Sequence, residues 1–168
     1  SIDIDTADVT NEFNTINVSG SADLDIGTLN AEVSTLNGTG FTGGITATFN
    51  TNSVDKSITG GSGNDVITIT GNGDDNIEAG DGDDNIIMGA TMNGDDMVNG
   101  GNGDDTLVIS MSTGATKTIS TVTDVEIIQV NSAITEVNAT NVTNTIDVSD
   151  VSGGDIRVSA TITDEEIG

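Results

Sequence analysis

The sequence predicts an all-β fold, a right-handed parallel β-roll or β-solenoid with a central block of short repeats. Two observations carry this prediction. The pattern G-G-x-G-x-D-x-U-x, in which U is a large aliphatic residue, occurs five times between residues 60 and 108. The segments on both sides of this block alternate between apolar and polar residues, as half-buried strands do.

Each position of the nine-residue repeat has a physical role. Glycine at positions 1, 2 and 4 permits backbone angles closed to other residues, so the turn can bend tightly and aim its carbonyl oxygens inward. Position 6 is always Asp, and position 8 is always an aliphatic residue that points into the core from a short strand. The copies are residues 60–68, 70–78, 79–87, 88–99 and 100–108, and the aliphatic residues are Ile67, Ile77, Ile86, Val98 and Leu107.

The Asp positions predict calcium sites. Two repeats make one coil, so Asp65, Asp84 and Asp105 align on one side of the roll and Asp75 and Asp96 on the other. Calcium takes about six to eight hard oxygen ligands, which carboxylates and carbonyls from two stacked turns can supply. We therefore expect at least three Ca²⁺ sites. The candidate metal-site residues are Gly60, Ser62, Asp65, Gly71, Gly73, Asp75, Gly80, Gly82, Asp84, Gly94, Asp96, Gly101, Gly103 and Asp105.

On these motifs, residues 60–108 resemble the repeats-in-toxin (RTX) family. Its members are typically exported by bacterial type I secretion and fold on meeting extracellular calcium, so the resemblance implies a secreted protein. The departures are Thr70, Ala79 and Met88 at position 1, and the extra Ile69. The fourth copy also carries three extra residues, 90–92, which predict a distorted turn at its Asp.

The charge of the chain agrees with a cation-binding protein. The net charge is -25, from 28 acidic residues against three basic ones, Lys56, Lys117 and Arg157. Such a chain repels itself when it is compacted without counterions. The same charge excludes nucleic acid as a partner, because phosphate binding needs a basic face. No apolar run is long enough to span a bilayer, so direct membrane insertion is not expected.

The composition also favours a solenoid over a compact globule. The chain has three Phe residues and no Trp, Tyr, His, Pro or Cys. A solenoid has a narrow core that stacked Ile, Val and Leu can fill, so it needs few large side chains. Without Cys there is neither a disulfide nor a zinc–thiolate site.

We expect a solenoid flank on each side of the central segment 60–108. These flanks are residues 1–59 and residues 109–168. Segments between residues 9 and 48 resemble segments between residues 122 and 158 at an offset of about 110 residues. A chain that begins and ends with a similar unit can continue a solenoid from subunit to subunit, which predicts a homo-oligomer or polymer. The alternating apolar pairs are Ile2 and Ile4, Ile16 and Val18, Leu24 and Ile26, Val125 and Ile127, Ile146 and Val148, and Ile156 and Val158.

A second resemblance rests on the Thr- and Asn-rich composition of these flanks. Phrases such as TINVSG, GFTGGITATF and VTDVEIIQVNSA, next to GGSGND repeats, are similar to bacterial surface-layer (S-layer) proteins secreted by the type I route. This resemblance implies calcium-dependent sheets on the bacterial cell surface, with a cell-surface polysaccharide as a further partner.

Catalysis is not expected. The absence of His, Cys and Tyr removes the usual bases and nucleophiles. The acid pairs recur at repeat spacing, and their position-5 members are expected to face solvent: Asp74, Asp83, Asp95 and Asp104. The sequence thus predicts an extracellular, calcium-dependent structural protein that self-assembles. The alternatives are a calcium-folding secretion module of a larger exported enzyme or toxin, and an adhesin or ice-binding solenoid with a flat Thr face.

Overall fold

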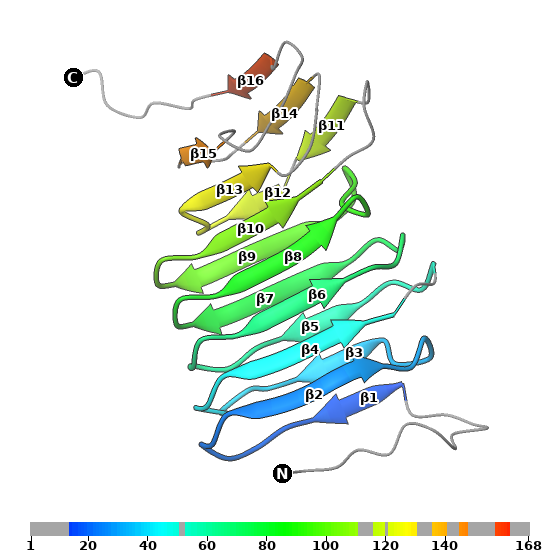
Figure 1. The fold of residues 1–168 in the computed structure, drawn as a ribbon, viewed down its shortest axis with the longest axis vertical. Coiled ribbons are helices and arrows are strands. Elements are labelled where there is room, and N and C mark those ends of the chain that lie inside the picture. Colours follow the sequence, from blue (N-terminus) through cyan, green and yellow to red (C-terminus); the bar gives the residue numbers. More distant parts are fainter. Residues whose placement is uncertain are drawn as a thin grey trace.

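The computed structural model describes residues 14–50, 53–110, 116–119, 121–130, 136–140, 145–147 and 157–161; for residues 116–118 and the last three ranges it describes the backbone alone. Parallel strands stack as a β-solenoid of about five turns (Figure 1). The described residues form no helix, and hence none long and apolar enough to cross a membrane. The predicted all-β parallel solenoid is confirmed. The expected strands at Ile2 and Ile4 lie outside the described residues.

All strand pairs are parallel and form three sheets. The six-stranded sheet has the order β1 (Thr15–Asn17), β3 (Thr35–Asn37), β5 (Ser57–Thr59), β7 (Asn76–Asp81), β9 (Met97–Asn102) and β12 (Thr121–Thr123). The seven-stranded sheet has the order β15 (Thr145–Asp147), β13 (Ile127–Val130), β10 (Thr106–Ile109), β8 (Asn85–Gly89), β6 (Val66–Ile69), β4 (Ile45–Phe49) and β2 (Leu24–Leu29). The three-stranded sheet has the order β11 (Thr116–Ile119), β14 (Glu136–Thr140) and β16 (Arg157–Thr161).

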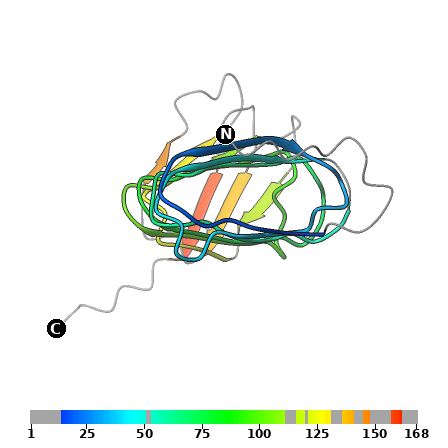
Figure 2. The same ribbon diagram turned by 90° about the horizontal axis from the view of Figure 1, so that it is seen from below.

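Up to β10 the chain alternates between the first two sheets, so each coil has one strand in each (Figure 1). Along the stack axis the coils outline a flattened oval (Figure 2). Ile67 pairs with Ile86, which pairs with Leu107, so two repeats make one coil, as predicted. From β11 onward, the chain also contributes strands to the three-stranded sheet. Both larger sheets continue across residues 60 and 108, through the β4–β6, β5–β7 and β10–β13 pairs.

The core is a column of aliphatic side chains between the two larger sheets. The five position-8 residues are buried, with exposures of 0–2 %. The alternation predicted for Val125 and Ile127 differs in the structure, where Ile127 is 40 % exposed and Ile128 is buried. Because side chains alternate in a strand, a shift of one residue reverses the face on which each lies.

The similar flank segments lie in different sheets. Residues 15–17 form β1 of the six-stranded sheet, whereas their matches, residues 128–130, lie in β13 of the seven-stranded sheet. Residues 45–48 lie in β4 of the seven-stranded sheet, whereas residues 157 and 158 lie in β16 of the three-stranded sheet. The two flanks are therefore not superimposable copies of one coil position.

Candidate metal centre

The Asp residues of the repeats stack along two margins of the solenoid. The turns that enter β6, β8 and β10 carry Asp65, Asp84 and Asp105, and we call this margin the first acidic edge. The turns that enter β7 and β9 carry Asp75 and Asp96, and we call this margin the second acidic edge. All five side chains are buried, with exposures of 0–2 %. The alignment is the one that the repeat spacing predicts.

Each buried carboxylate is held by a backbone N–H of the preceding coil. Asp84 Oδ1 accepts from the Asp65 N–H at 2.7 Å, and Asp105 Oδ1 accepts from the Asp84 N–H at 2.8 Å. On the second acidic edge, Asp96 Oδ1 accepts from the Asp75 N–H at 2.8 Å. Each of these hydrogen bonds engages one carboxylate oxygen, Oδ1. The contacts of the second oxygen, Oδ2, are a separate question.

The second oxygens differ from turn to turn. Asp65 Oδ2 accepts from the Gly61 N–H at 3.0 Å. Asp84 Oδ2 and Asp105 Oδ2 are buried and have no hydrogen-bond partner. A buried ionised oxygen without a partner is costly, because burial removes its hydration and nothing replaces it. A cation beside these two oxygens would supply what they lack.

Burial also shifts the titration of these groups. The pKa of Asp84 is raised to about 7, mainly by burial and to a smaller extent by the nearby carboxylates of Asp65 and Asp105. Burial raises the pKa of Asp75 to about 6, with a smaller contribution from Asp96. The pKa values of Asp65 and Asp105 are raised by burial as well. The edges thus disfavour their own ionised form, which a bound cation would reverse.

Glycine at position 1 keeps room beside the carboxylates. A β-carbon on Gly60 would collide with Asp65 Oδ2 and with the carbonyl oxygen of Ala79. A β-carbon on Gly100 would collide with the Asp124 carbonyl oxygen and would lie 2.5 Å from Asp105 Oδ2. Carboxylate and carbonyl oxygens therefore converge where the sequence has glycine, and these are the oxygen types that calcium prefers.

Glycines at positions 2 and 4 let stacked turns approach closely. Gly80 and Gly101 pair in register between β7 and β9, and a β-carbon on Gly101 would collide with the Gly80 carbonyl oxygen. Gly82 and Gly103 stack in the same way at position 4, with φ angles of 114° and 147° that favour glycine. The glycine spacing of the repeat thus serves both turn shape and coil contact.

The remaining predicted site residues have other surroundings. Ser62 is exposed, and its hydroxyl donates to the Phe41 carbonyl oxygen at 3.4 Å rather than to a carboxylate. Gly71 and Gly73 are buried in the first turn of the second acidic edge, and Gly94 is exposed in the turn before β9. The structure thus brings together the predicted residues of the first acidic edge, apart from the Ser62 side chain.

Asn93, the residue that follows the insertion, satisfies the carboxylate of Asp96. Asp96 Oδ2 accepts from the Asn93 N–H at 2.6 Å, and the Asn93 side-chain amide lies 3.3 Å from Asp96 Oδ1. Met92, which belongs to the insertion, is fully buried in the core. Asn93 therefore gives Asp96 Oδ2 a hydrogen bond that Asp84 Oδ2 and Asp105 Oδ2 lack.

Glu126 extends the first acidic edge into the C-terminal flank, and the repeat pattern did not reveal it. Its Oε2 accepts from the Asp105 N–H at 2.7 Å, as an Asp would in the next coil. The turn before it is short and contains Asp124, whose φ of 50° is the one positive value of a non-glycine residue among those described. The one feature of the sequence that could have revealed Glu126 is its position immediately before the strand at residues 127–130.

Lys56 is a second residue that the pattern missed. It is 2 % exposed, and its backbone N–H donates to Asp75 Oδ1 at 2.8 Å. Its ammonium group lies 3.5 Å from the Ala31 carbonyl oxygen. Burial lowers the pKa of Lys56, and the charges of Asp75, Glu32 and Asp55 oppose this change. A buried positive charge therefore lies beside the N-terminal end of the second acidic edge.

The position-5 residues are exposed, as expected, but they also form a ladder. Asn64 Oδ1 accepts from the Asp83 N–H at 3.0 Å, and Asp83 Oδ1 accepts from the Asp104 N–H at 3.1 Å. In these bonds the later coil donates to the earlier one, opposite to the buried ladder. Two antiparallel sets of hydrogen bonds thus connect neighbouring turns of the first acidic edge.

A metal ion at this site would have two kinds of ligand, carboxylate side chains and backbone carbonyl groups. Among the described residues, no group of three or more His, Cys, Asp or Glu side chains could hold a metal ion. A calcium ion at the first acidic edge would therefore need backbone carbonyl oxygens in addition to Asp84 and Asp105. With that addition, the unpaired oxygens of Asp84 and Asp105, and the space that Gly100 leaves beside Asp105, fit a hard cation.

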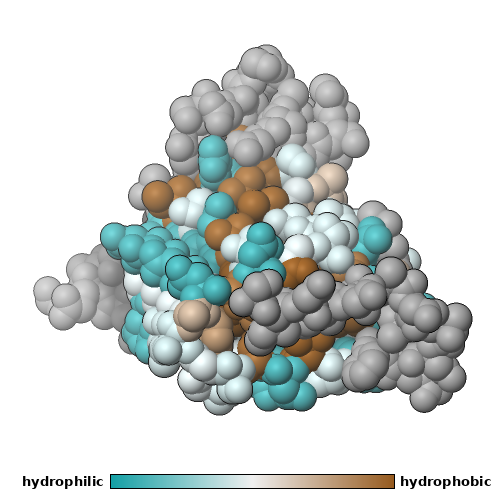
Figure 3. Space-filling view, turned by 60° about the horizontal axis from the view of Figure 1, so that its bottom comes forward, coloured by the Kyte–Doolittle hydropathy of each residue, from teal (hydrophilic) through white to brown (hydrophobic). Residues whose placement is uncertain are grey.

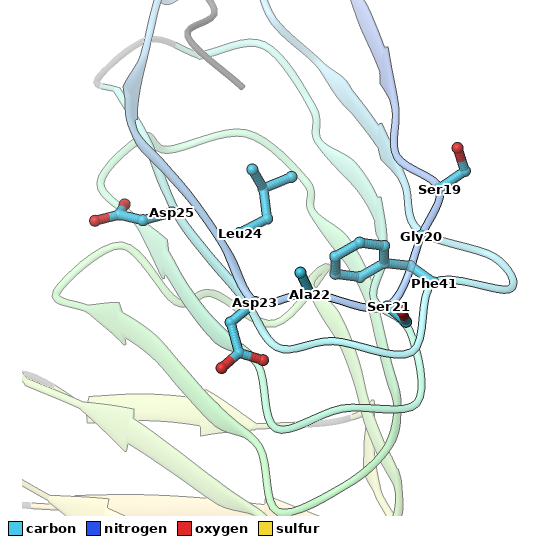
Figure 4. A pocket seen from close by; sticks show the side chains of 8 residues that line it. All are labelled: Ser19, Gly20, Ser21, Ala22, Asp23, Leu24, Asp25 and Phe41. Carbon is cyan, nitrogen blue, oxygen red and sulfur yellow. The ribbon is translucent and has the colours of Figure 1, made fainter. Parts of the chain in front are cut away.

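The N-terminal end of the first acidic edge carries a cavity of about 320 Å³. Figure 4 shows its lining, where Leu24 and Phe41 contribute apolar groups and the carboxylate of Asp25 points away. Hydrophobic surface at this end of the molecule is bordered by hydrophilic residues (Figure 3). The Asp23 carboxylate accepts from the Gly44 N–H at 2.9 Å, so it is engaged in coil stacking.

No family model, curated protein or solved structure matches the chain. A functional conclusion must therefore come from the site itself. Its features are buried carboxylates in register, two of them with an unpaired oxygen, beside turns that only glycine can form.

Proposed function

We propose that the chain is an extracellular structural protein that folds on binding Ca²⁺ and then self-assembles on a bacterial cell surface. The observation that carries this proposal is the pair of buried oxygens, Asp84 Oδ2 and Asp105 Oδ2, that lack any partner in the protein. Calcium supplies positive charge and open coordination positions to such oxygens. No catalytic activity is proposed.

Folding would follow calcium concentration by mass action. In a cytosol poor in free calcium, a net charge of -25 opposes compaction and keeps the chain in a form suited to export. Outside, sites with affinities on the order of 0.1 to 1 mM fill, and ligand bound only to the folded state stabilises it. Asp65, Asp84 and Asp105 would hold calcium together with turn carbonyls on the first acidic edge, and Asp75 would do so on the second.

Self-assembly is the second half of the proposal. The S-layer resemblance of the flanks supports it. So does the architecture of the described residues, in which each sheet ends in a strand that pairs on one side with another described strand. Subunits that associate head to tail form filaments or sheets when their symmetry does not close. A cell-surface polysaccharide would serve as the anchor.

The test is circular dichroism together with negative-stain microscopy, from chelator to about 10 mM calcium, above the range expected for extracellular modules. We expect β-structure and ordered sheets or filaments to appear together as calcium rises. Magnesium at the same concentration is the matched control, because its smaller ion demands near-octahedral geometry. A chain that is already folded in chelator would overturn the calcium switch.

A specific observation favours one alternative, the secretion module. The edge strand β2 has a β-bulge between Asp25 and Gly27, and Asp25 Oδ1 accepts the Gly27 N–H at 2.9 Å. Bulges and charged residues on an edge strand prevent pairing with another chain. Calcium-dependent folding to a lasting monomer would support this alternative, whereas assembly would exclude it.

A further inference from the structure

The outer face of the seven-stranded sheet carries no charge over five strands. We call this surface the uncharged face and define it by the outward residues of β4, β6, β8, β10 and β13. One row is Thr46, Val66, Asn85, Thr106 and Ile127, and the next is Thr48, Thr68, Ile87, Val108 and Gln129. In a chain with 28 acidic residues, ten adjacent outward positions without one acid are unexpected.

The uncharged face is also the more apolar of the two broad faces. Val66, Ile87 and Val108 are partly exposed on it, and Ile127 is 40 % exposed. The outward positions of the six-stranded sheet are mainly Thr, Ser and Asn, with Met97 as the large apolar side chain and the exposed Glu78 as an acid. The asymmetry between the faces distinguishes an interaction surface from the scattered apolar residues of an ordinary surface.

We propose that the uncharged face binds the same face of a second copy of this chain. Two identical chains of charge -25 repel each other wherever their acidic edges meet, and this face is where they can approach without opposing carboxylates. A flat surface that meets itself gives an isologous contact. The bulged edge strand β2, with its Asp25, makes the N-terminal end a poorer alternative.

The inference names the surface of the self-association proposed above, and it needs the solenoid to be folded. With a rise of about 3.3 Å per residue and strands about 4.8 Å apart, the face covers roughly 300 Å². A stable interface buries about 800 Å² on each partner. One such contact is therefore weak, and it becomes effective when further contacts in an assembly hold the same subunits together.

The test compares two double variants with equal charge changes in saturating calcium. Ile87→Lys with Val108→Lys places two charges on the uncharged face, and Ser57→Lys with Thr121→Lys places two on the six-stranded sheet. Sedimentation velocity at increasing concentration should show self-association of the unmodified chain and of the control, but not of the uncharged-face variant. Circular dichroism must show the same fold in all three proteins, which separates this result from a failure of calcium-dependent folding.

Because the chain has no Cys, single cysteines give an independent readout. Ile87→Cys lies on the central strand of the face and should form disulfide-linked dimers on oxidation, whereas Ser57→Cys should not. Equal crosslinking of both variants, or a folded chain that stays monomeric at the highest concentration and does not crosslink through Ile87→Cys, would overturn the proposal. Monomers that bind insoluble cellulose through Ile87 would also overturn it and assign the face to a polymer.

Discussion

On the first acidic edge two buried carboxylates keep an oxygen without a partner, whereas on the second the protein supplies its own compensation. Asp84 and Asp105 have the unpaired oxygens of the first acidic edge. On the second, Asn93 donates to Asp96, and the buried charge of Lys56 lies beside Asp75. One repeat pattern thus produces two margins that differ in how much they need an external cation.

The comparison shows how departures from a repeat can carry information. Asn93, just after the insertion at residues 90–92, donates hydrogen bonds to Asp96, and the charge of Lys56 acts on Asp75. Both supply from the protein what a cation would supply on the first acidic edge. We infer that the second acidic edge folds with less help from calcium than the first. Substitutions on each edge can test that difference.

The largest expected effect comes from the insertion. Met92 is fully buried, and Met92→Ala should destabilise the protein by about 2 to 5 kcal/mol through loss of burial and the cavity left behind. Met97→Ala is the matched control, because Met97 is 46 % exposed and its loss should change stability by less than about 0.5 kcal/mol. Urea unfolding in saturating calcium measures both. Equal effects would mean that the insertion does not belong to the core.

Lys56→Met tests the built-in positive charge of the second acidic edge. The substitution keeps an unbranched side chain but leaves Asp75 with less compensation. In chelator, with the osmolyte trimethylamine N-oxide added to populate the folded state without calcium, stability should therefore fall by roughly 1 to 3 kcal/mol. Calcium should restore part of this loss if the ion takes over the role of the ammonium group. Unchanged unfolding in chelator would show that the lysine is not needed there.

Asp84→Asn tests the first acidic edge with little change in shape. The amide can still accept the Asp65 N–H but cannot offer a carboxylate, so the calcium midpoint of folding should rise about tenfold, equivalent to about 1.4 kcal/mol. In chelator with the same osmolyte, the variant should be at least as stable as the unmodified chain, because a costly buried charge is gone. The control is Asp83→Asn at the exposed neighbouring position. A control that shifts the midpoint equally would point to general charge rather than to a site.

The sequence was sufficient for the fold and for the register of the acids. Five copies with an intact Asp and aliphatic position fix two strands per coil, so the stacking of Asp65, Asp84 and Asp105 follows from spacing alone. It could not identify Glu126, because a longer acid at the same coil position falls outside the repeat pattern. Nor could the sequence show that Lys56 is buried, because an isolated basic residue among many acids is expected to lie at the surface.

Proton uptake tests the same comparison without any substitution. The pKa of Asp84 rises from its ordinary 3.8 to about 7 and that of Asp75 to about 6, so between about pH 4 and 7 the folded chain binds protons that the unfolded chain has released. In chelator, stability should therefore increase as pH falls through this window, by roughly 1.4 kcal/mol per pH unit for each carboxyl that titrates in this way.

In calcium the dependence should reverse, because protons and the cation compete for the same oxygens. The calcium midpoint should rise as the pH is lowered from about 7 to about 5, where Asp84 and then Asp75 take up protons. Asp84→Asn should remove most of the chelator effect above about pH 6, since Asp75 titrates lower. Urea unfolding at several pH values, in calcium and in chelator with the osmolyte that populates the folded state, measures both trends. Stability in chelator that falls with acid would contradict the buried, cation-seeking state of the first acidic edge.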